Sequence, residues 1–308
     1  MTESSSGAQL TIARRVAYLG GSFSVGVYSA FNNYTMSLWL TSFTTSYVII
    51  SLLGNSKSVE GSIVSPLFGA WSDRIWLGWL GRRRPFILVG GVLSGLLMAI
   101  TPWVARWPAP HGLGLPPDVQ QILPIIVVVF LFTLTFNMGD DLHKALRADL
   151  TDDAELNLMS SLATIVDIAS QVGILALGFW LWNDSVPDWA FLLAGGLVAA
   201  GALATTIGIT EPEPIVWAER MAGAEHEALS ALDILRRYRG ALVFCAVTLA
   251  YWSGVNAVLP LLSIFVRDIL RTSAGEAQLL PGLLLLSSTL MAIPVGWLGT
   301  LVGKRRVL

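Results

Sequence analysis

The sequence predicts an all-α protein that crosses a membrane several times. Of its 308 residues, 54% are hydrophobic and only 13% are charged, and the mean hydropathy is +0.65. Soluble domains carry about twice that charged fraction. Low-charge stretches recur along the chain, and many of them reach the ~20 residues that a helix needs to cross a bilayer. These observations exclude a disordered tail, a disulfide scaffold and an ordinary cytosolic enzyme.

The low-charge stretches predict eight membrane helices, at about 16–42, 46–72, 86–105, 122–146, 157–182, 189–210, 239–265 and 277–301. Pro212 and Pro214 end the sixth helix, and a charged loop follows it. Leu229, Leu232 and Leu235 predict a short amphipathic helix in that loop, on the inner membrane surface. The expected units are a polar segment 1–15, a six-helix bundle 16–210, a central loop 211–238, and two helices of a second bundle within 239–308.

Charge asymmetry predicts the orientation of the chain. Most arginines and lysines fall in segments that share one side of the membrane, whereas the other side holds only Arg106, Arg267 and Arg271. The positive-inside rule therefore predicts that both termini are cytoplasmic, in a multi-pass protein of the plasma membrane. Tryptophans near the helix ends, such as Trp39, Trp103 and Trp182, predict an aromatic belt.

Several function classes are excluded or disfavoured. The net charge of −2 is spread along the chain, so nucleic acid is not an expected partner. The single cysteine, Cys245, cannot form an internal disulfide. We find no nucleophile elbow, phosphate-binding glycine loop or metal-binding histidine motif. The sequence therefore predicts neither an enzyme nor a metal or organic cofactor.

A glycine–acid–arginine motif joins the second and third predicted helices. The chain reads Gly69-Ala70-Trp71-Ser72-Asp73-Arg74 and, after six intervening residues, Gly81-Arg82-Arg83-Arg84-Pro85-Phe86. Glycine permits tight turns and close helix approach. An aspartate at the membrane edge can pair with an arginine and hold neighbouring helices in one conformation. We expect a gating function for Gly69, Asp73, Arg74, Gly81, Arg82, Arg83 and Arg84.

These residues resemble the major facilitator superfamily, and within it the sugar–cation symporter branch of glycoside–pentoside–hexuronide and sucrose–proton symporters. Three further stretches are similar to that branch: Lys144–Thr151 after helix four, Asn256–Pro260 with Gly275–Ala277, and Gly296–Arg306. The last resembles a second copy of the motif, with Thr300 and Leu301 at its usual Asp and Arg positions. The resemblance implies twelve helices in two six-helix halves. A sequence of eight predicted helices is then expected to be either a fragment or a shortened form.

Ionisable residues inside membrane helices are costly and are candidates for function. Lys57 and Glu60 lie on one face of the second predicted helix, at i,i+3 spacing, where they can neutralise each other. Either they form a structural ion pair, or Glu60 is protonated and deprotonated during transport.

The fifth predicted helix carries a polar stripe of Ser160, Thr164, Asp167 and Gln171. Such a stripe lines a wet cavity or a packed interface. Asp167 near the membrane midplane suits reversible protonation; the alternative is a structural acid that faces helix two, paired with Lys57.

Two aspartates occupy the inner part of the fourth predicted helix. Asp140 and Asp141 are spaced to pair with Lys144, and Asp149 follows. A gating network that includes Lys144 and Asp149 is the first interpretation, and a carboxylate pair within the transport cavity is the second. His143 is expected to be solvated or paired rather than a ligand.

Amide and indole side chains on the first and seventh predicted helices could contact a sugar. Asn32 and Asn33 can both donate and accept hydrogen bonds to hydroxyl groups. Trp252 and Asn256 share a helix face, where an indole could pack against a sugar ring. Ordinary helix packing is the alternative for Trp252.

The leading hypothesis is a secondary active transporter that couples a sugar or glycoside to protons. The expected partners are this small molecule and the lipid bilayer, and the expected coupling ion is the proton. Alternatives are a transporter of a non-sugar metabolite with the same fold, and a truncated, inactive membrane protein.

Overall fold

The computed structural model describes residues 10–108, 110, 112, 114, 116–151, 153–211 and 239–302. Throughout these ranges the regular structure is helical, as predicted. The long helices are α1 (Ile12–Ala30), α4 (Ser56–Ser72), α5 (Arg84–Val104), α6 (Pro117–Leu150), α7 (Asp153–Leu181), α8 (Asp188–Gly208), α11 (Arg239–Leu270) and α12 (Leu279–Val302). Among the described residues, five helices are long and apolar enough to cross a membrane, namely α5, α6, α7, α8 and α11.

The first two predicted helices are interrupted rather than continuous. After α1 the backbone forms a π-helical segment, Phe31–Thr35, which leads into α2 (Met36–Leu40). The second helix is divided at Asn55 into α3 (Tyr47–Gly54) and α4. The predicted amphipathic helix near Leu229 lies outside the described residues.

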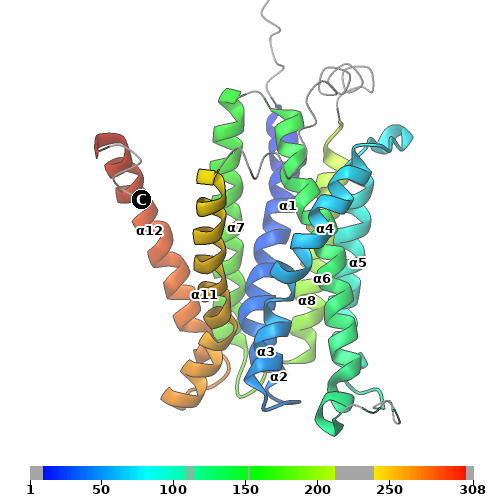
Figure 1. Cartoon of the computed structure of the whole chain (residues 1–308), viewed down its shortest axis with the longest axis vertical. Helices are drawn as coiled ribbons and strands as arrows, with labels where there is room; N and C mark the ends of the chain where they lie inside the picture. The colour runs from blue at the N-terminus through cyan, green and yellow to red at the C-terminus, as the bar shows by residue number, and fades with distance from the viewer. Residues whose placement is uncertain are drawn as a thin grey trace, which may run out of the picture.

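The helices run up and down in a bundle (Figure 1). α1 packs between α7 and α8, α5 packs on α6 and α8, and α4 packs on α6. α11 contacts α2, α3 and the π-helical segment, and α12 contacts α7. The loop between α4 and α5, the α6–α7 connection and the end of α8 share one end of the bundle, which we call the arginine end. The opposite end, with residues 41–46 and 182–187, is the far end.

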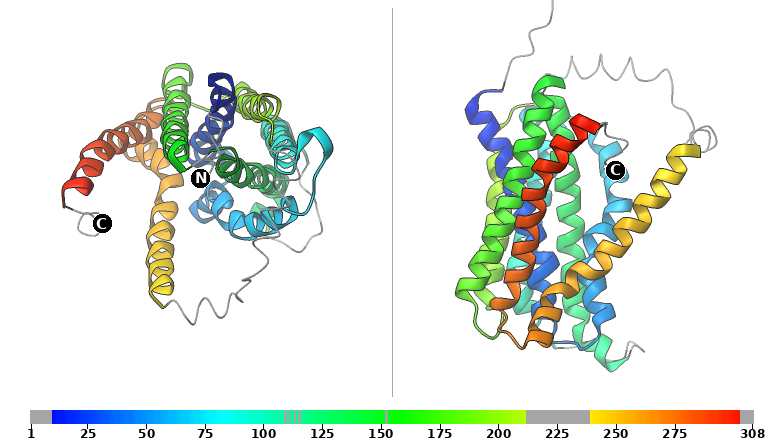
Figure 2. Two further views of the ribbon diagram at one scale, coloured as in Figure 1. Left: turned by 90° about the horizontal axis from the view of Figure 1, so that it is seen from above. Right: turned by 90° about the vertical axis from the view of Figure 1, so that its left-hand side faces the viewer.

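The two last helices lean away from the bundle toward the arginine end (Figure 2). They meet the rest of the protein near the far end, where α11 and α12 are joined by residues 271–278. The two groups of helices, α1–α8 and α11–α12, are therefore closer together at the far end.

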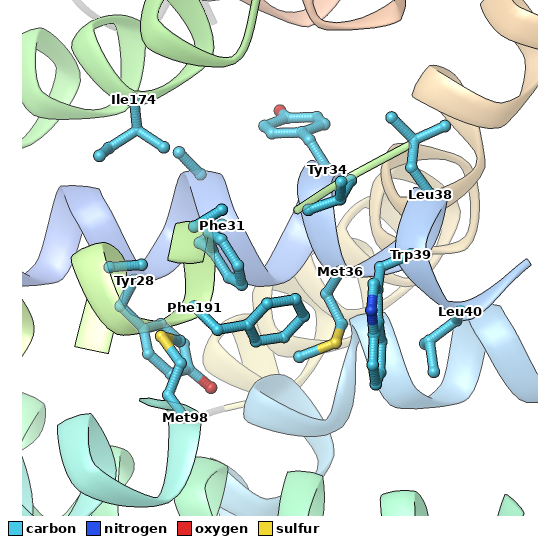
Figure 3. Close-up of a cluster of buried hydrophobic side chains, with 14 of the residues drawn as sticks. Tyr28, Phe31, Tyr34, Met36, Leu38, Trp39, Leu40, Met98, Ile174 and Phe191 are labelled. Atoms are coloured by element: carbon cyan, nitrogen blue, oxygen red, sulfur yellow. The ribbon is translucent and has the colours of Figure 1, made fainter. Parts of the chain in front are cut away.

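An aromatic core fills the far half of the bundle (Figure 3). The Phe191 ring packs edge-on against Phe31 and Trp39, with both centroid distances at 4.8 Å. Trp39 and Trp182 are buried in this core. The predicted belt is therefore wrong for these two residues, whereas Trp103, Trp107, Trp180 and Trp189 are exposed near the far end.

Candidate functional site

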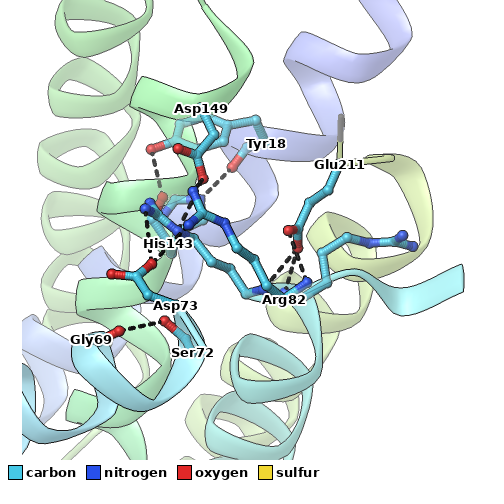
Figure 4. A network of polar contacts seen from close by, with 10 residues as sticks. Tyr18, Gly69, Ser72, Asp73, Arg82, His143, Asp149 and Glu211 are labelled. Carbon is cyan, nitrogen blue, oxygen red and sulfur yellow. Dashed lines mark hydrogen bonds and ion pairs between the residues drawn. The ribbon is translucent and has the colours of Figure 1, made fainter. Parts of the chain in front are cut away.

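Arg82 joins two carboxylates at the arginine end (Figure 4). Its Nη1 lies 2.8 Å from Asp73 Oδ1, and its Nη2 lies 2.7 Å from Asp149 Oδ2. Asp73 follows α4 and Asp149 is near the end of α6, so one guanidinium connects two helices. Arginine suits this position because its planar group presents two donor directions at once.

The other arginines of the motif have different surroundings. Arg83 Nε lies 3.0 Å from Asp149 Oδ2. Burial lowers the pKa of Arg83, and the Asp149 carboxylate opposes that shift. Arg84 is buried and donates from Nε to the Thr206 carbonyl at 2.9 Å, which joins α5 to α8. Arg74 is exposed, and its side chain forms no ion pair with the described residues.

Glu211 completes this network, and the sequence interpretation missed it. Its carboxylate accepts hydrogen bonds from the backbone N–H groups of Arg82, Arg83 and Arg84, at 3.0, 2.9 and 2.8 Å. A carboxylate at a helix N-terminus satisfies unpaired N–H groups and favours the helix dipole. The available signal was an acidic residue directly after helix six, on the same side as the arginine motif.

Only one of the two motif glycines lies where an added Cβ would collide with a described neighbour. Gly81 has φ +76°, and a Cβ there would lie 2.7 Å from the Glu211 carboxyl carbon. At Gly69 a Cβ would meet no described atom within 4 Å. The tight turn and close approach expected of the motif glycines are therefore found at Gly81, and among the described atoms Gly69 shows neither.

The charged residues inside the bundle pair across helices. Lys57 Nζ lies 2.9 Å from Asp140 Oδ2, and Lys144 Nζ lies 3.0 Å from the same oxygen. Lys144 also contacts Asp141 at 3.6 Å. The predicted Asp140–Lys144 and Asp141–Lys144 contacts are thus present. The predicted Lys57–Glu60 pair is wrong, because Lys57 reaches from α4 to Asp140 on α6.

Glu60 is buried on α4, three residues after Lys57. Within the described part of the chain, no hydrogen-bond donor reaches either carboxylate oxygen. An isolated ionised carboxylate is costly to bury, whereas a neutral carboxyl group is far less so.

A cavity of about 180 Å³ lies between α1, α6 and α7. It brings together Asp140, Lys144 and Arg147 of α6 with Thr164 and Asp167 of α7. Asp167 Oδ1 accepts a hydrogen bond from Gln171 Nε2 at 3.0 Å, so the expected pairing of Asp167 with Lys57 is replaced by a contact within α7.

His143 forms one wall of the cavity and is buried rather than solvated. Its ring stacks on Tyr18 at 4.3 Å, and its Nε2 lies 3.0 Å from the Tyr18 carbonyl oxygen. The Tyr18 hydroxyl donates in return to the His143 carbonyl at 3.3 Å. This reciprocal pair fixes α1 against α6.

The three predicted sugar-contacting asparagines, Asn32, Asn33 and Asn256, lie apart from this cavity. Asn32 Nδ2 donates to the Gly54 carbonyl at 2.9 Å, and Asn33 is half-buried with its carbonyl bonded to Ser37. The Asn256 carbonyl accepts a hydrogen bond from Asn55. The Trp252 side chain lies outside what the structure describes, as do the side chains of Gly296–Arg306. Asn32, Asn33 and Asn256 are not among the residues that line the described cavity.

The described residues include no group of three or more His, Cys, Asp or Glu side chains that could hold a metal ion. The polar groups of the site are instead carboxylates, lysines and amides placed between helices. Such groups can bind a polar solute and exchange protons.

Comparison with known proteins identifies the family. Residues 18–308 match the family described as the Major Facilitator Superfamily. The chain belongs to this superfamily, and the five helices of the described residues that are long and apolar enough to cross a membrane agree with a multi-pass membrane protein.

The chain is also similar to individual proteins. It is 30% identical over 135 residues to solute carrier family 45 member 4 of Mus musculus, and 35% identical over 94 residues to the Homo sapiens protein. These matches cover 42% and 30% of this chain, but only 17% and 12% of the relatives. The chain thus matches less than a fifth of the length of either relative.

Two solved structures share the fold. A crystal structure of a D-xylose–proton symporter has a TM-score of 0.56 and covers 92% of this chain and 67% of that protein. A partially occluded, inward-open conformation of the xylose transporter XylE from E. coli has a TM-score of 0.51, with 92% and 71% coverage. Both are 15% identical in sequence, so the likeness concerns the fold alone.

Proposed function

We propose that this protein is a secondary active transporter that moves a sugar or glycoside together with a proton. The observation that carries the proposal is the buried Glu60 carboxyl group, which lacks a donor among the described residues, beside an ion-paired Lys57–Asp140–Lys144 cluster. A fixed cluster keeps its charges in place, while an unpaired carboxyl group is free to change its proton. The solved structures that share its fold include a D-xylose–proton symporter, which supports a sugar as substrate.

In this proposal the cavity between α1, α6 and α7 receives the substrate. Asp167 and Thr164, which line it, offer an acceptor and a hydroxyl group of the kind that bind sugar hydroxyls, and Gln171 holds the Asp167 carboxylate. The arginine end faces the cytoplasm, because its loops carry most of the positive charge. The contacts of Arg82 and Glu211 hold the helix ends there and form the gate.

Uptake into proteoliposomes tests this function. The purified chain is reconstituted, and an inwardly directed proton gradient is imposed by making the outside more acidic. Accumulation of labelled mono- and disaccharides is then measured with and without a protonophore. We expect at least one sugar to accumulate, and we expect the protonophore to abolish this accumulation. Gradient-driven uptake of only non-sugar solutes would replace sugar as the substrate class. Sugar uptake that ignores the gradient would overturn proton coupling.

A further inference from the structure

Three irregular points of the helices meet at one place. The π-helical segment after α1, the break between α3 and α4, and Pro260 inside α11 are each departures from regular α-helix. Asn32 Nδ2 donates to the carbonyl of Gly54 at the break, at 2.9 Å. A Cβ on Gly54 would lie 2.7 Å from Pro260 Cβ and 3.1 Å from Ser37 Oγ, so the backbone of the break packs directly on the proline.

Pro260 leaves one carbonyl of α11 without its helical donor. Proline has no N–H, so the carbonyl four residues earlier, that of Asn256, loses its intrahelical hydrogen bond. Inside a membrane, such a group needs a partner from the protein. Asn55 Nδ2 donates to the Asn256 oxygen, and it also donates to Ser51 on its own helix at 3.2 Å. An amide nitrogen has two hydrogens and can serve both carbonyls.

The exposure of α11 changes at this point. Before Pro260 the helix leaves the bundle, and Tyr251 is 64% exposed. After Pro260 it packs into the core, where Ile264 is 2% exposed. Two more contacts hold the same region together: Arg267 Nη1 donates to Thr41 Oγ1 at 2.7 Å, and the Gly275 N–H donates to the Asn183 carbonyl at 3.3 Å.

We infer that Asn55 is a positioning residue that joins the break between α3 and α4 to α11 by supplying the hydrogen bond that Pro260 removes, and so holds α11 and α12 against the other helices in the far half. This inference rests on the proposed transport function, carried out by alternating access, in which the two groups of helices part at one end of the protein and then at the other. The hydrogen bond from Asn55 to the Asn256 carbonyl stabilises the conformation in which the two groups of helices touch at the far end. In this conformation α11 leans outward at the arginine end (Figure 2). When the far ends part, the Asn256 carbonyl loses Asn55.

The test measures the far-end distance directly, without any need for transport. Spin labels are placed at Ser42→Cys and Ile269→Cys, both exposed positions, in a Cys245→Ser background, and distances are recorded in nanodiscs by pulsed electron resonance. Losing one hydrogen bond typically changes an equilibrium about fivefold. We therefore expect Asn55→Ala to raise the ratio of parted to joined far ends about fivefold, whereas Ser287→Ala, which removes a bond within α12, leaves it unchanged.

A double-mutant cycle identifies the cause. Pro260→Ala restores an N–H that can bond the Asn256 carbonyl within α11, so Asn55→Ala should then shift the ratio less than twofold. Gly54→Ala, which forces the break away from Pro260, should part the far ends as Asn55→Ala does. An unchanged distance distribution in folded Asn55→Ala protein, or an equal shift with and without Pro260, would overturn the inference. Neither outcome depends on whether the substrate is a sugar.

Discussion

At the scale of single residues, the arginine end depends on guanidinium geometry. Arg82 holds Asp73 and Asp149 with two different nitrogens, and Asp149 is only about one-eighth exposed (12%). A lysine carries the same charge on a single ammonium group and cannot reproduce this fork.

Arg82→Lys should therefore destabilise the protein while keeping its net charge. Losing one partly buried charged hydrogen bond predicts a decrease of about 1–2 kcal/mol in the free energy of unfolding. Thermal unfolding in detergent measures it, with exposed Arg74→Lys as the matched control. Equal melting temperatures for the two variants would contradict the role of Arg82.

The sequence predicted the contacts within one helix here, and it missed those between helices. Asp140 and Asp141 lie within one helix turn of Lys144, so their contacts follow from helical spacing. Lys57 instead contacts Asp140 on another helix, and this pairing depends on how α4 and α6 are rotated and displaced against each other. Glu211 escaped notice for the same reason, since its partners are 127–129 residues away in the chain.

At the scale of elements, small residues let helices touch. A Cβ at Gly95 would lie 2.3 Å from the Gly195 carbonyl oxygen, so α5 and α8 are in backbone contact there. Gly91 lies equally close to α8, because a Cβ there would lie 2.2 Å from Ala202 Cβ. Membrane helices associate in this way because van der Waals packing replaces the hydrophobic effect.

Gly95→Ala should separate α5 from α8. The added methyl group meets backbone, which cannot rotate away, and overpacking of this kind costs about 1–3 kcal/mol. Gly196→Ala on α8 is the matched control, because a Cβ there meets nothing within 4 Å among described atoms. Melting temperatures measure both. A Gly95→Ala protein as stable as Gly196→Ala would contradict the close contact.

At the arginine end, Gly81→Ala should destabilise the protein and Gly69→Ala should not. Gly81 combines positive φ with contact to Glu211, so alanine is expected to cost about 1–2 kcal/mol there. Gly69 is helical and unobstructed, so alanine should be neutral or stabilising by up to about 1 kcal/mol. Unfolding midpoints of the two variants measure this difference. A lower midpoint for Gly69→Ala than for Gly81→Ala would contradict the account.

The ends of most helices were predictable, and their interruptions were not. Hydropathy placed the starts of α5 and α8 within two residues, because a helix must begin near the membrane surface. The π-helical segment at Phe31 and the break at Asn55 follow from contacts with Gly54 and α11, which no local pattern encodes.

At the scale of the whole molecule, the positive charge of the arginine end predicts its side of the membrane. Trp79 at this end and Trp107 near the far end are both exposed. Single cysteines at these positions, in a Cys245→Ser background, can be labelled with a membrane-impermeant maleimide in intact cells. We expect Trp107→Cys to react at once and Trp79→Cys to react only after permeabilisation. The reverse pattern would contradict the orientation.

The central claim is that Glu60 carries the coupled proton, and Glu60→Gln tests it most directly. Glutamine keeps the size of the side chain but cannot exchange a proton. In proteoliposomes, the account predicts loss of pH-gradient-driven accumulation while exchange of labelled for unlabelled substrate continues at near the native rate. Asp167→Asn should impair accumulation less, and Asp184→Asn, at an exposed position of the far end, should impair neither process. Accumulation by Glu60→Gln at the native level, or equal loss of accumulation and exchange, would contradict the claim.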